Sequence, residues 1–364
     1  AAELAKMGEV LTNNQIGGRR NMIINGGMNI FQRSSSATGL GASSGYFSAD
    51  RFRIFTTNLA GRVTMSQSSD TPEGFGNSLK IDVTTADTSI AADELFILSY
   101  AMEGKDAQMI KKGTSEAESL TVSFYAKANA NANYVVEMYD QDNTRNNTQA
   151  FTVTNSWQRF SFTFAPDTTG TLDDDSALSF YPIQIWLHGG SNFTSGTFAS
   201  NTWGSITNAN RYAGSRTSIF DSTDREFYIT GVQVEVGSVA TPFEHRSYGD
   251  ELRLCQRYFE VSGTGSDNPA GYNFKSMFVG VAHNSGYIPG QQFSVEKRAD
   301  ATVVIFSRNG TSGKVSSFNT GSDEGNNHAI NAGGVTGFHA VQRDGGTFTT
   351  GQGYEYGYTA EAEL

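Results

Sequence analysis

The feature that most constrains the fold is a series of short segments in which apolar and polar residues alternate. In residues 120–127, for example, one face would carry the apolar side chains Leu120, Val122, Phe124 and Ala126. This period of two predicts a strand with one buried face. Comparable segments lie at 51–56, 61–68, 78–84, 94–101, 119–127, 133–140, 148–153, 157–164, 178–187 and 226–236. Neither helical patterns between these segments nor a repeat of fixed length is present, so the sequence predicts a β-sandwich of jelly-roll type.

A helical signal follows the last of these strands. Pro242 ends the extended run, and Ser247 with Asp250 three residues later has the pattern of a capping box. After it, Leu252, Cys255 and Phe259 would share one helical face. The helix is therefore predicted to connect the sandwich to the region that follows it in the sequence.

A second β-rich region follows the helix. Its clearest strands are predicted at 274–281, 302–307, 313–318, 337–342 and 354–359. About 100 residues suit one small domain. The expected fold is thus all-β, with a jelly-roll β-sandwich, a short connecting helix and a smaller C-terminal β domain. Its expected parts are an N-terminal helical attachment segment (1–20), the sandwich (21–246), the connecting helix (247–262) and the C-terminal domain (263–364).

Two further segments lie before the first alternating strand. Met22–Ile24 is predicted to begin the first strand, and the Ser/Gly-rich residues 34–45 are predicted to be a flexible loop. Nearer the N-terminus, Leu4, Met7 and Leu11 follow a helical spacing over a segment too short to be stable alone in water. Such a helix either docks on its own domain or associates with other copies or with a particle, and the sequence leaves both open.

The charge pattern excludes several classes of function. The formal net charge is −11, and basic residues cluster only in pairs such as Lys111–Lys112, which argues against nucleic-acid binding. No apolar run approaches the roughly 20 residues of a membrane span, so membrane insertion is not expected. The single cysteine, Cys255, rules out an intrachain disulfide framework, and residues 1–10 lack the apolar stretch of a signal peptide. We therefore expect synthesis in a reducing cytoplasm.

The surface composition suggests where ligands could bind. Charged residues are only 17% of the chain, against about 25% in typical domains, so Asn, Ser, Thr and Gly must cover much of the surface. Residues 188–225 form a stretch too long for an ordinary connection, and long loops on rigid scaffolds often carry function. Its aromatic residues Trp203 and Tyr212 are candidates to stack on sugar rings, and Phe193 is a further one.

The C-terminal region offers one more candidate. Tyr354, Tyr356 and Tyr358 alternate, so they share one face of a strand, and Tyr356 is the glycan-contact candidate there. If that face is buried, these tyrosines belong to the core, and the 188–225 loop becomes the better prediction.

Catalytic and metal motifs are weak. The segment "GASSG" (41–45) matches G-x-S-x-G, but it lies in a Ser/Gly loop and not between a strand and a helix. No two carboxylates are marked out as a glycosidase pair. Asp140–Asp142 and Asp173–Asp175 could offer oxygen ligands to calcium, although a solvated turn is the commoner meaning of such clusters. We expect no enzymatic activity, no catalytic residues and no cofactor, with calcium as the one ion left open.

Several segments resemble a known family. Residues 19–33, 48–54, 157–164 and above all "ITGVQVEVGSVATPFEHRSYGDELRLCQRYFE" (229–260) resemble bacteriophage tail-fibre and virion structural proteins with a carbohydrate-binding-module-like jelly roll. Residues 293–315 and 354–364 look like the small C-terminal β domain of that family. Asn21 and Asn25–Gly26 are similar to the opening of calcium-containing carbohydrate-binding modules. Thr230–Gly231 stand where those modules carry an acidic pair, which argues against their structural calcium.

The resemblance implies a virion protein, assembled in the host cytoplasm and usually trimeric. We therefore expect a tail fibre or other receptor-recognition component that binds host surface polysaccharide as a homotrimer. Its N-terminal segment would attach to other virion proteins. A capsid decoration or head-fibre protein, and a tailspike enzyme that degrades polysaccharide, are the alternatives that the sequence leaves open.

Overall fold

The computed structural model describes residues 20–172, 180–262, 275–278, 287–325, 327–344 and 348–364. The chain divides into two compact units. One contains the described part of residues 1–31, residues 35–247 and residue 364, and the other contains 32–34 and 248–363. The predicted end of the sandwich at residue 246 therefore lies one residue from the division between the units.

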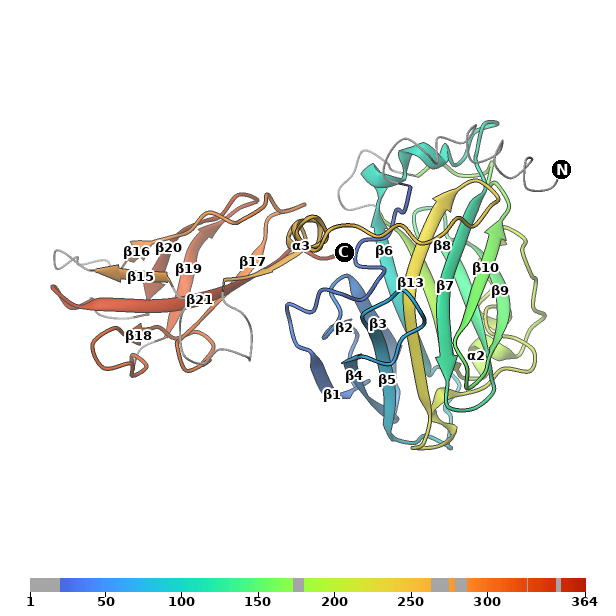
Figure 1. The fold of residues 1–364 in the computed structure, drawn as a ribbon, viewed down its shortest axis with the longest axis horizontal. Helices are drawn as coiled ribbons and strands as arrows, with labels where there is room; N and C mark the ends of the chain where they lie inside the picture. The colour runs from blue at the N-terminus through green and yellow to red at the C-terminus, as the bar shows by residue number, and fades with distance from the viewer. Residues whose placement is uncertain (1–19, 173–179, 263–274, 279–286, 326, 345–347) are drawn as a thin grey trace. The chain divides into compact units, whose positions relative to one another are not determined.

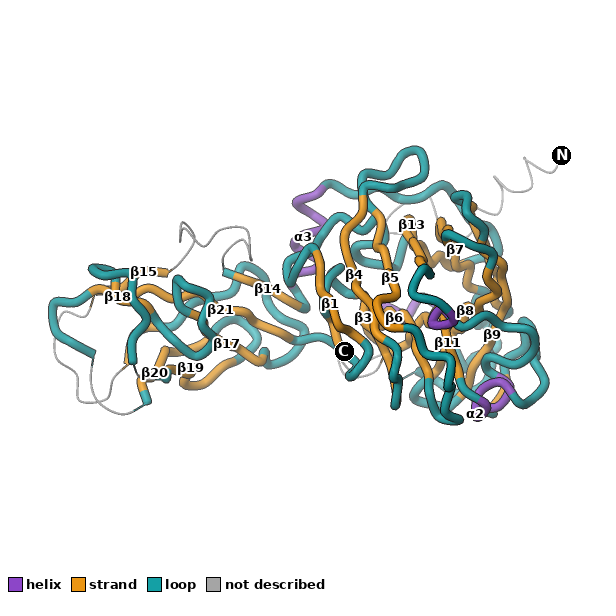
Figure 2. Tube along the Cα trace, turned by 90° about the horizontal axis from the view of Figure 1, so that it is seen from below, coloured by secondary structure: helices purple, strands orange, loops and turns teal. Residues whose placement is uncertain are grey.

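The first unit is a sandwich of two antiparallel sheets (Figure 1). The first sheet has the strand order β1 (Ser36–Leu40), β4 (Arg62–Ser68), β5 (Ser78–Thr85), β13 (Glu226–Val236), β7 (Leu120–Ala128), β10 (Gln158–Phe164). The second has the order β12 (Gly204–Ser205), β9 (Arg145–Val153), β8 (Ala132–Asp140), β11 (Phe180–Gly189), β6 (Leu95–Glu103), β3 (Phe52–Thr57), β2 (Gly45–Tyr46). The run from β3 through β6, β11 and β8 to β9 can be followed across Figure 2. The jelly-roll sandwich and all of its alternating strands are thus confirmed, with ends shifted by a few residues.

The apolar face of each strand forms the core between the sheets. Phe124 on β7 and Phe227 on β13 are fully buried. Their rings meet aromatic rings of the second sheet, Phe151 at 5.4 Å and Tyr134 at 5.7 Å between centroids, both edge to face. Burying one such side chain contributes about 1.5–3 kcal/mol. The polar residues that alternate with the core residues consequently lie on the outward faces, where a ligand could reach them.

The strand predicted at Met22–Ile24 is wrong, because these residues form a buried segment without regular secondary structure. Two asparagine side chains replace the hydrogen bonds of a strand ladder. The Oδ1 atom of Asn21 accepts hydrogen bonds from the backbone N–H groups of Ile23 and Val234. The Oδ1 atom of Asn25, whose φ is 60°, accepts from the N–H groups of residues 29 and 30. The Asn side chains thus satisfy buried backbone groups beyond the hydrogen bond that Met22 N–H donates to the Val234 carbonyl of β13.

The loop predicted at 34–45 is only partly a loop. Ser36–Leu40 forms β1 and pairs with β4, and Gly45–Tyr46 forms β2 and pairs with β3. Composition alone favoured a flexible segment, but each short strand forms an edge of a sheet whose neighbour supplies the hydrogen bonds. Edge strands this short are common in natural sheets.

In its described residues, the second unit contains the helix α3 and two small sheets (Figure 1, orange to red). The long strand β21 (Gly353–Glu361) is the centre of the first sheet, in which it pairs with β14 (Phe259–Val261), β15 (Lys275–Phe278), β17 (Thr302–Phe306) and β18 (Ser316–Ser317). The second sheet has the order β16 (Tyr287–Pro289), β20 (Phe338–Arg343), β19 (His328–Gly333). The C-terminal β domain predicted from 263 is therefore present, although β14 shows that it starts earlier.

The helix α3 (Tyr248–Gln256) begins one residue after Ser247, as the capping pattern predicts. Two expectations about it need correction. The helix and β14 belong to the second unit and do not form a separate connecting part, since β14 pairs with β21. Phe259 lies on β14, beyond the end of the helix, and both it and Cys255 are buried. Phe259 therefore does not share the expected helical face with Leu252 and Cys255.

Candidate functional site

Aromatic and charged side chains gather on the outward face of the first sheet. Tyr228 lies on β13, Lys127 on β7 and Lys80 on β5, at positions that alternate with core residues. Trp157 immediately precedes β10, and Asp70 follows β4. We call these five residues, together with Glu226 at the start of β13, the Trp157 patch.

Hydrogen bonds hold the aromatic rings of the patch in place. The indole N–H of Trp157 donates to Asp70 Oδ1 at 2.9 Å, and Lys127 forms an ion pair with the same carboxylate. The Lys127 ammonium lies 4.7 Å from the ring centroid of Tyr228 and 5.6 Å from that of Trp157. The Trp157 ring is partly exposed, and its centroid is 6.3 Å from that of Tyr228. The patch therefore presents an aromatic surface whose orientation is set before a ligand arrives.

The other side of Tyr228 is equally ordered. Lys80 pairs with Glu226 at 2.6 Å, and the Tyr228 hydroxyl donates to the second oxygen of that carboxylate at 3.0 Å. Burial, followed by the hydrogen bond to Glu226, raises the pKa of Tyr228 to about 12. Burial alone would raise the pKa of Glu226, but the hydrogen bonds from Lys80 and Tyr228 outweigh it and lower that pKa. At neutral pH the carboxylate is therefore ionised and the phenol keeps its proton.

The charges of the patch indicate which ligands it can accept. Lys80 also lies 3.3 Å from Asp82, so three carboxylates face the two ammonium groups. Each ammonium already has a carboxylate partner, and an anionic ligand would have to compete for it. The Trp157 ring is partly exposed and stands edge to face on the largely buried ring of Tyr228. An indole held in this way and bordered by fixed donors and acceptors instead suits a neutral ligand with many hydroxyl groups.

The sequence-predicted residues Tyr212 and Phe193 are buried and do not face solvent. Tyr212 is 2% exposed and Phe193 is 8% exposed. Both rings pack on Trp186 of β11, Tyr212 in a stacked arrangement at 5.9 Å and Phe193 tilted at 5.4 Å. The Tyr212 hydroxyl donates to the carbonyl of Thr217 at 2.7 Å. The prediction that Tyr212 and Phe193 contact a sugar is therefore wrong. Both side chains instead pack the 188–225 segment against the second sheet.

A buried ion pair completes this anchor. The Arg211 guanidinium donates to both oxygens of the fully buried Glu137, at 2.9 and 2.8 Å, and to Gln184 Oε1 at 3.0 Å. The indole N–H of Trp186 and the Asn146 amide also donate to Glu137, each at 2.6 Å. The long segment, which includes α2 (Ser191–Thr194) and two 3₁₀ turns, is thereby fixed against the outward face of the second sheet.

Trp203 is the predicted loop residue that keeps part of its ring exposed. Its indole N–H donates to the Ala165 carbonyl at 2.7 Å, and its ring stacks on the buried Tyr181 at 6.1 Å. It therefore remains a candidate contact, but with fewer polar groups around it than Trp157 has.

Tyr356 was predicted as a contact in the C-terminal region, and its ring lies instead in the core of the second unit. Tyr354, Tyr356 and Tyr358 are each no more than 2% exposed and pack with Phe338 and Phe348 in one cluster. The shared strand face of the tyrosines is thus a core face. The sequence predicted that these tyrosines belong to the core if their shared face is buried. They are therefore no longer candidates for glycan contact.

Asp140, the first acid of a predicted calcium turn, already has a cationic partner. The Lys112 ammonium lies 2.5 Å from Asp140 Oδ2 and 3.2 Å from Asp167 Oδ2, and it donates to the carbonyls of Thr169 and Gly170. Both Lys112 and Asp140 side chains are at most 1% exposed. The second predicted turn, Asp173–Asp175, lies outside the described residues. Within the described residues, no group of three or more His, Cys, Asp or Glu side chains is arranged to hold a metal ion.

A Ser–His–Glu arrangement at the other end of the sandwich does not form an accessible site. His188 Nδ1 is 2.7 Å from Ser218 Oγ, and His188 Nε2 is 3.4 Å from Glu94 Oε2. The His188 ring is fully buried, and burial lowers its pKa to about 4 despite the nearby Asp87. Ser218 Oγ also accepts the backbone N–H of Phe220. A neutral imidazole that no substrate can reach indicates a structural role.

Sequence reasoning missed the Trp157 patch, although a signal was present. The alternation in 119–127 and 226–236 places Lys127 and Tyr228 on polar faces, and Trp157 opens a strand directly after the polar turn 154–156. What the sequence could not supply was the pairing of β7 with β13 and of β10 with β7, which brings these residues together.

Comparisons with known proteins give structural neighbours only. No protein-family model and no curated protein matches the sequence. The chain is similar to a CBM4 carbohydrate-binding module at 16% identity, over 58% of this chain and 97% of that one, with a TM-score of 0.31. A family 11 carbohydrate-binding module from Clostridium thermocellum, in complex with a β-1,3-1,4-mixed-linked tetrasaccharide, has 13% identity over 57% of this chain and 99% of that one, with a TM-score of 0.28.

A bacteriophage protein is also among the neighbours. The enzymatically active domain of tailspike protein 4 of bacteriophage CBA120 has 11% identity over 59% of this chain, which spans 21% of that one, with a TM-score of 0.29. At TM-scores this low, the fold described above rests on the sheets of this chain itself. In the part of the chain that the structure describes, no helix has the length and apolar character needed to span a bilayer.

Proposed function

We propose that this protein is a bacteriophage virion component, most specifically a tail-fibre protein, that recognises neutral glycans on the host surface. The observation that carries the proposal is the Trp157 patch: a partly exposed indole, fixed by Asp70, beside Lys127 and the largely buried Tyr228 on the outward face of the first sheet. The resemblance of residues 229–260 to virion structural proteins supports the assignment to a phage particle.

The patch suits a sugar chain lying across the sheet. The Trp157 ring offers an apolar face to the C–H groups of a pyranose, as aromatic side chains with one polar end commonly do. The bordering carboxylates of Asp70 and Glu226 accept hydrogen bonds from hydroxyl groups, and the two lysines donate them. The excess of carboxylates predicts that neutral polysaccharides bind better than anionic ones.

The main test is Trp157→Ala. Truncating a central tryptophan typically costs at least 2 kcal/mol of binding free energy, so the affinity for host surface polysaccharide is expected to fall roughly 30-fold. Calorimetry with purified neutral polysaccharide measures the affinity, and Trp203→Ala serves as the matched control that removes the other partly exposed loop indole. Full affinity in Trp157→Ala combined with loss in Trp203→Ala would move the site to the 188–225 segment. Unchanged affinity in both variants would refute the proposed glycan-binding function.

The same samples test whether the protein only binds. We propose recognition without cleavage, because the sequence marks out no two carboxylates as a glycosidase pair. Incubated polysaccharide is expected to keep its chain length and release no reducing ends. Release of reducing ends, abolished by substitution of one Asp or Glu, would replace this proposal with a tailspike enzyme.

We also propose that the protein acts as a homotrimer attached to the particle through its N-terminal segment. Linked copies raise avidity without new contacts, which suits weak glycan binding. Leu4, Met7 and Leu11 motivate the association, although they lie outside the described residues. Sedimentation at micromolar concentration is expected to show three chains, and removal of residues 1–20 is expected to weaken the assembly. A full-length monomer under these conditions would contradict the proposal.

A further inference from the structure

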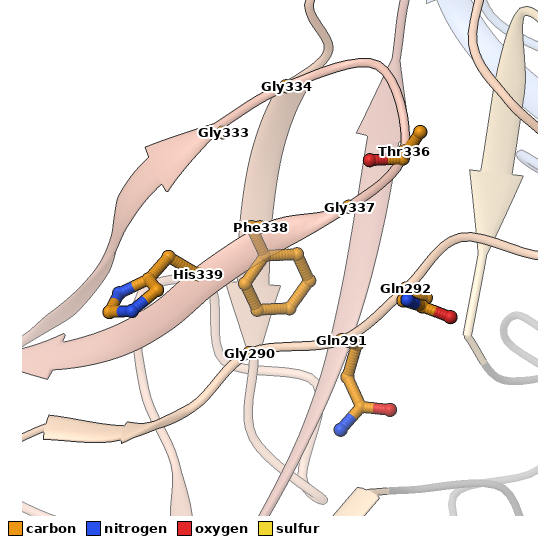
Figure 3. A pocket seen from close by; sticks show the side chains of 9 residues that line it. All are labelled: Gly290, Gln291, Gln292, Gly333, Gly334, Thr336, Gly337, Phe338 and His339. Atoms are coloured by element: carbon orange, nitrogen blue, oxygen red, sulfur yellow. The ribbon is translucent and has the colours of Figure 1, made fainter.

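An open hollow in the second unit has the properties of a second ligand site. It has a volume of about 440 Å³, within the range of roughly 300–1,000 Å³ typical of small-molecule sites. Its lining comes from the segment after β16, the end of β19, the turn that follows and the start of β20. It comprises Gly290, Gln291, Gln292, Gly333, Gly334, Thr336, Gly337, Phe338 and His339 (Figure 3). No part of the Trp157 patch contributes to it.

Glycines bring the two segments together and keep the hollow open. A Cβ atom on Gly290 would lie 1.7 Å from the Phe338 carbonyl oxygen, and one on Gly337 would lie 2.3 Å from that of Gln291. Backbone hydrogen bonds from Gly290 N–H to the His339 carbonyl and from Phe338 N–H to the Gln291 carbonyl close the contact. Gly334 differs, because the nearest atom to its added Cβ would be 3.9 Å away. Gly334 therefore borders free space.

The lining is polar but carries no carboxylate, ammonium or guanidinium group. It offers the amides of Gln291 and Gln292, the hydroxyl of Thr336 and the imidazole of His339. Figure 3 shows these side chains around the ring of Phe338. The Gln291 side chain is also hydrogen-bonded to the Tyr356 hydroxyl, which fixes one amide in advance. Phe338 is buried and packs edge to face on Tyr358 at 5.2 Å, so its ring anchors the start of β20 in the core of the unit.

We infer that this hollow is a second binding site, for one ring of a neutral sugar, in addition to the Trp157 patch. Amide, hydroxyl and imidazole groups both donate to and accept from sugar hydroxyls. The net charge of −11 on the chain disfavours phosphorylated and other anionic ligands. This inference goes beyond the proposed function, because the site lies in a different unit and needs none of the patch residues.

The test uses full-length Trp157→Ala protein, in which the first site is impaired. Saturation-transfer NMR with a panel of glucose, galactose, mannose and N-acetylglucosamine at millimolar concentration is expected to show binding of at least one sugar. Adding Gly334→Leu places a side chain in the hollow without a clash in the free protein, and should reduce the signal about tenfold or more. The matched control is Gly325→Leu, in the same unit, where an added Cβ also meets open space. It should leave the signal unchanged.

Hydrogen exchange locates the site independently of the variants. The bound sugar is expected to protect the backbone amides of residues 290–293 and 333–339. Absence of binding by the whole panel, or a signal that survives Gly334→Leu, would overturn the inference. These results are separable from the proposed function, which depends on the effect of Trp157→Ala on polysaccharide affinity.

Discussion

Replacing Lys112 with methionine is expected to destabilise the sandwich by about 3–5 kcal/mol, because it leaves the carboxylates of Asp140 and Asp167 buried with one cation fewer. Arg145 pairs with Asp167 at 2.9 Å and compensates part of the charge, whereas Asp140 receives further hydrogen bonds from the uncharged amide of Asn143. For a unit of this size the midpoint of thermal unfolding should fall by roughly 6–20 °C. Calorimetry or circular dichroism at neutral pH measures the change.

The neighbouring Lys111 supplies the control. Its side chain is 52% exposed and forms a surface pair with Glu118 at 3.2 Å, so Lys111→Met should change stability by no more than about 1 kcal/mol. In Lys112→Ala the vacated position is surrounded by carboxylate and carbonyl oxygens, the ligands that calcium prefers. Calcium is expected to restore part of the lost stability in that variant. Equal stability of the Lys112→Met and Lys111→Met proteins would refute the role assigned to the buried ammonium.

Arg211→Met is expected to cost a comparable 3–5 kcal/mol and to release the 188–225 segment. The substitution leaves the fully buried Glu137 without a cation, although the Trp186 indole and the Asn146 amide still donate to it. Chemical denaturation measures the loss of stability, and limited proteolysis measures the exposure of the segment. Cleavage should concentrate between residues 190 and 225, since Arg211 is the charged residue that joins this segment to the second sheet through Glu137.

Two further variants separate the buried pair from general effects of losing an arginine. Arg225 pairs with the partly exposed Asp221 at 2.6 Å, and Arg225→Met should cost no more than about 1 kcal/mol. In a Glu137→Gln background, Arg211→Met should be much less costly, because the remaining partner is no longer charged. If Arg211→Met costs the same in both backgrounds, the charge of Glu137 is not the reason for the loss.

Much of the fold could be predicted because local alternation reflects burial in a sandwich. The strands around Val122, Val136 and Ile229 were predicted from period-two patterns, and these residues face the core. The failures occurred where long-range pairing or side-chain hydrogen bonds replace the local pattern. The irregular segment at Met22–Ile24 depends on Asn21 and Asn25, and the two-residue strand β2 exists only through its pairing with β3. No local pattern of hydrophobicity carries such information.

The candidate site was less predictable than the fold. Exposed and buried aromatic residues look alike in a polar segment, so Tyr212 and Phe193 seemed as accessible as Trp203. The structure buries the first two against Trp186 because Arg211 and Glu137 hold the segment down on the sheet. Trp157 was not predicted as a ligand contact, because its partners Asp70 and Tyr228 are far from it in the sequence.

The sequence by itself determined the all-β class, the strand positions of the sandwich and the start of helix α3. It also determined the negative net charge and the large share of uncharged polar residues. These properties depend on residue type and on spacing over a few positions, which the chain carries locally. Only the tertiary structure decided which aromatic rings are exposed and that the Lys112 ammonium pairs with Asp140 of the predicted calcium turn. It also decided that residues far apart in the sequence form the Trp157 patch and the hollow in the second unit. Burial and electrostatic pairing depend on neighbours brought together by strand pairing across many residues, and a single strand does not specify its partners.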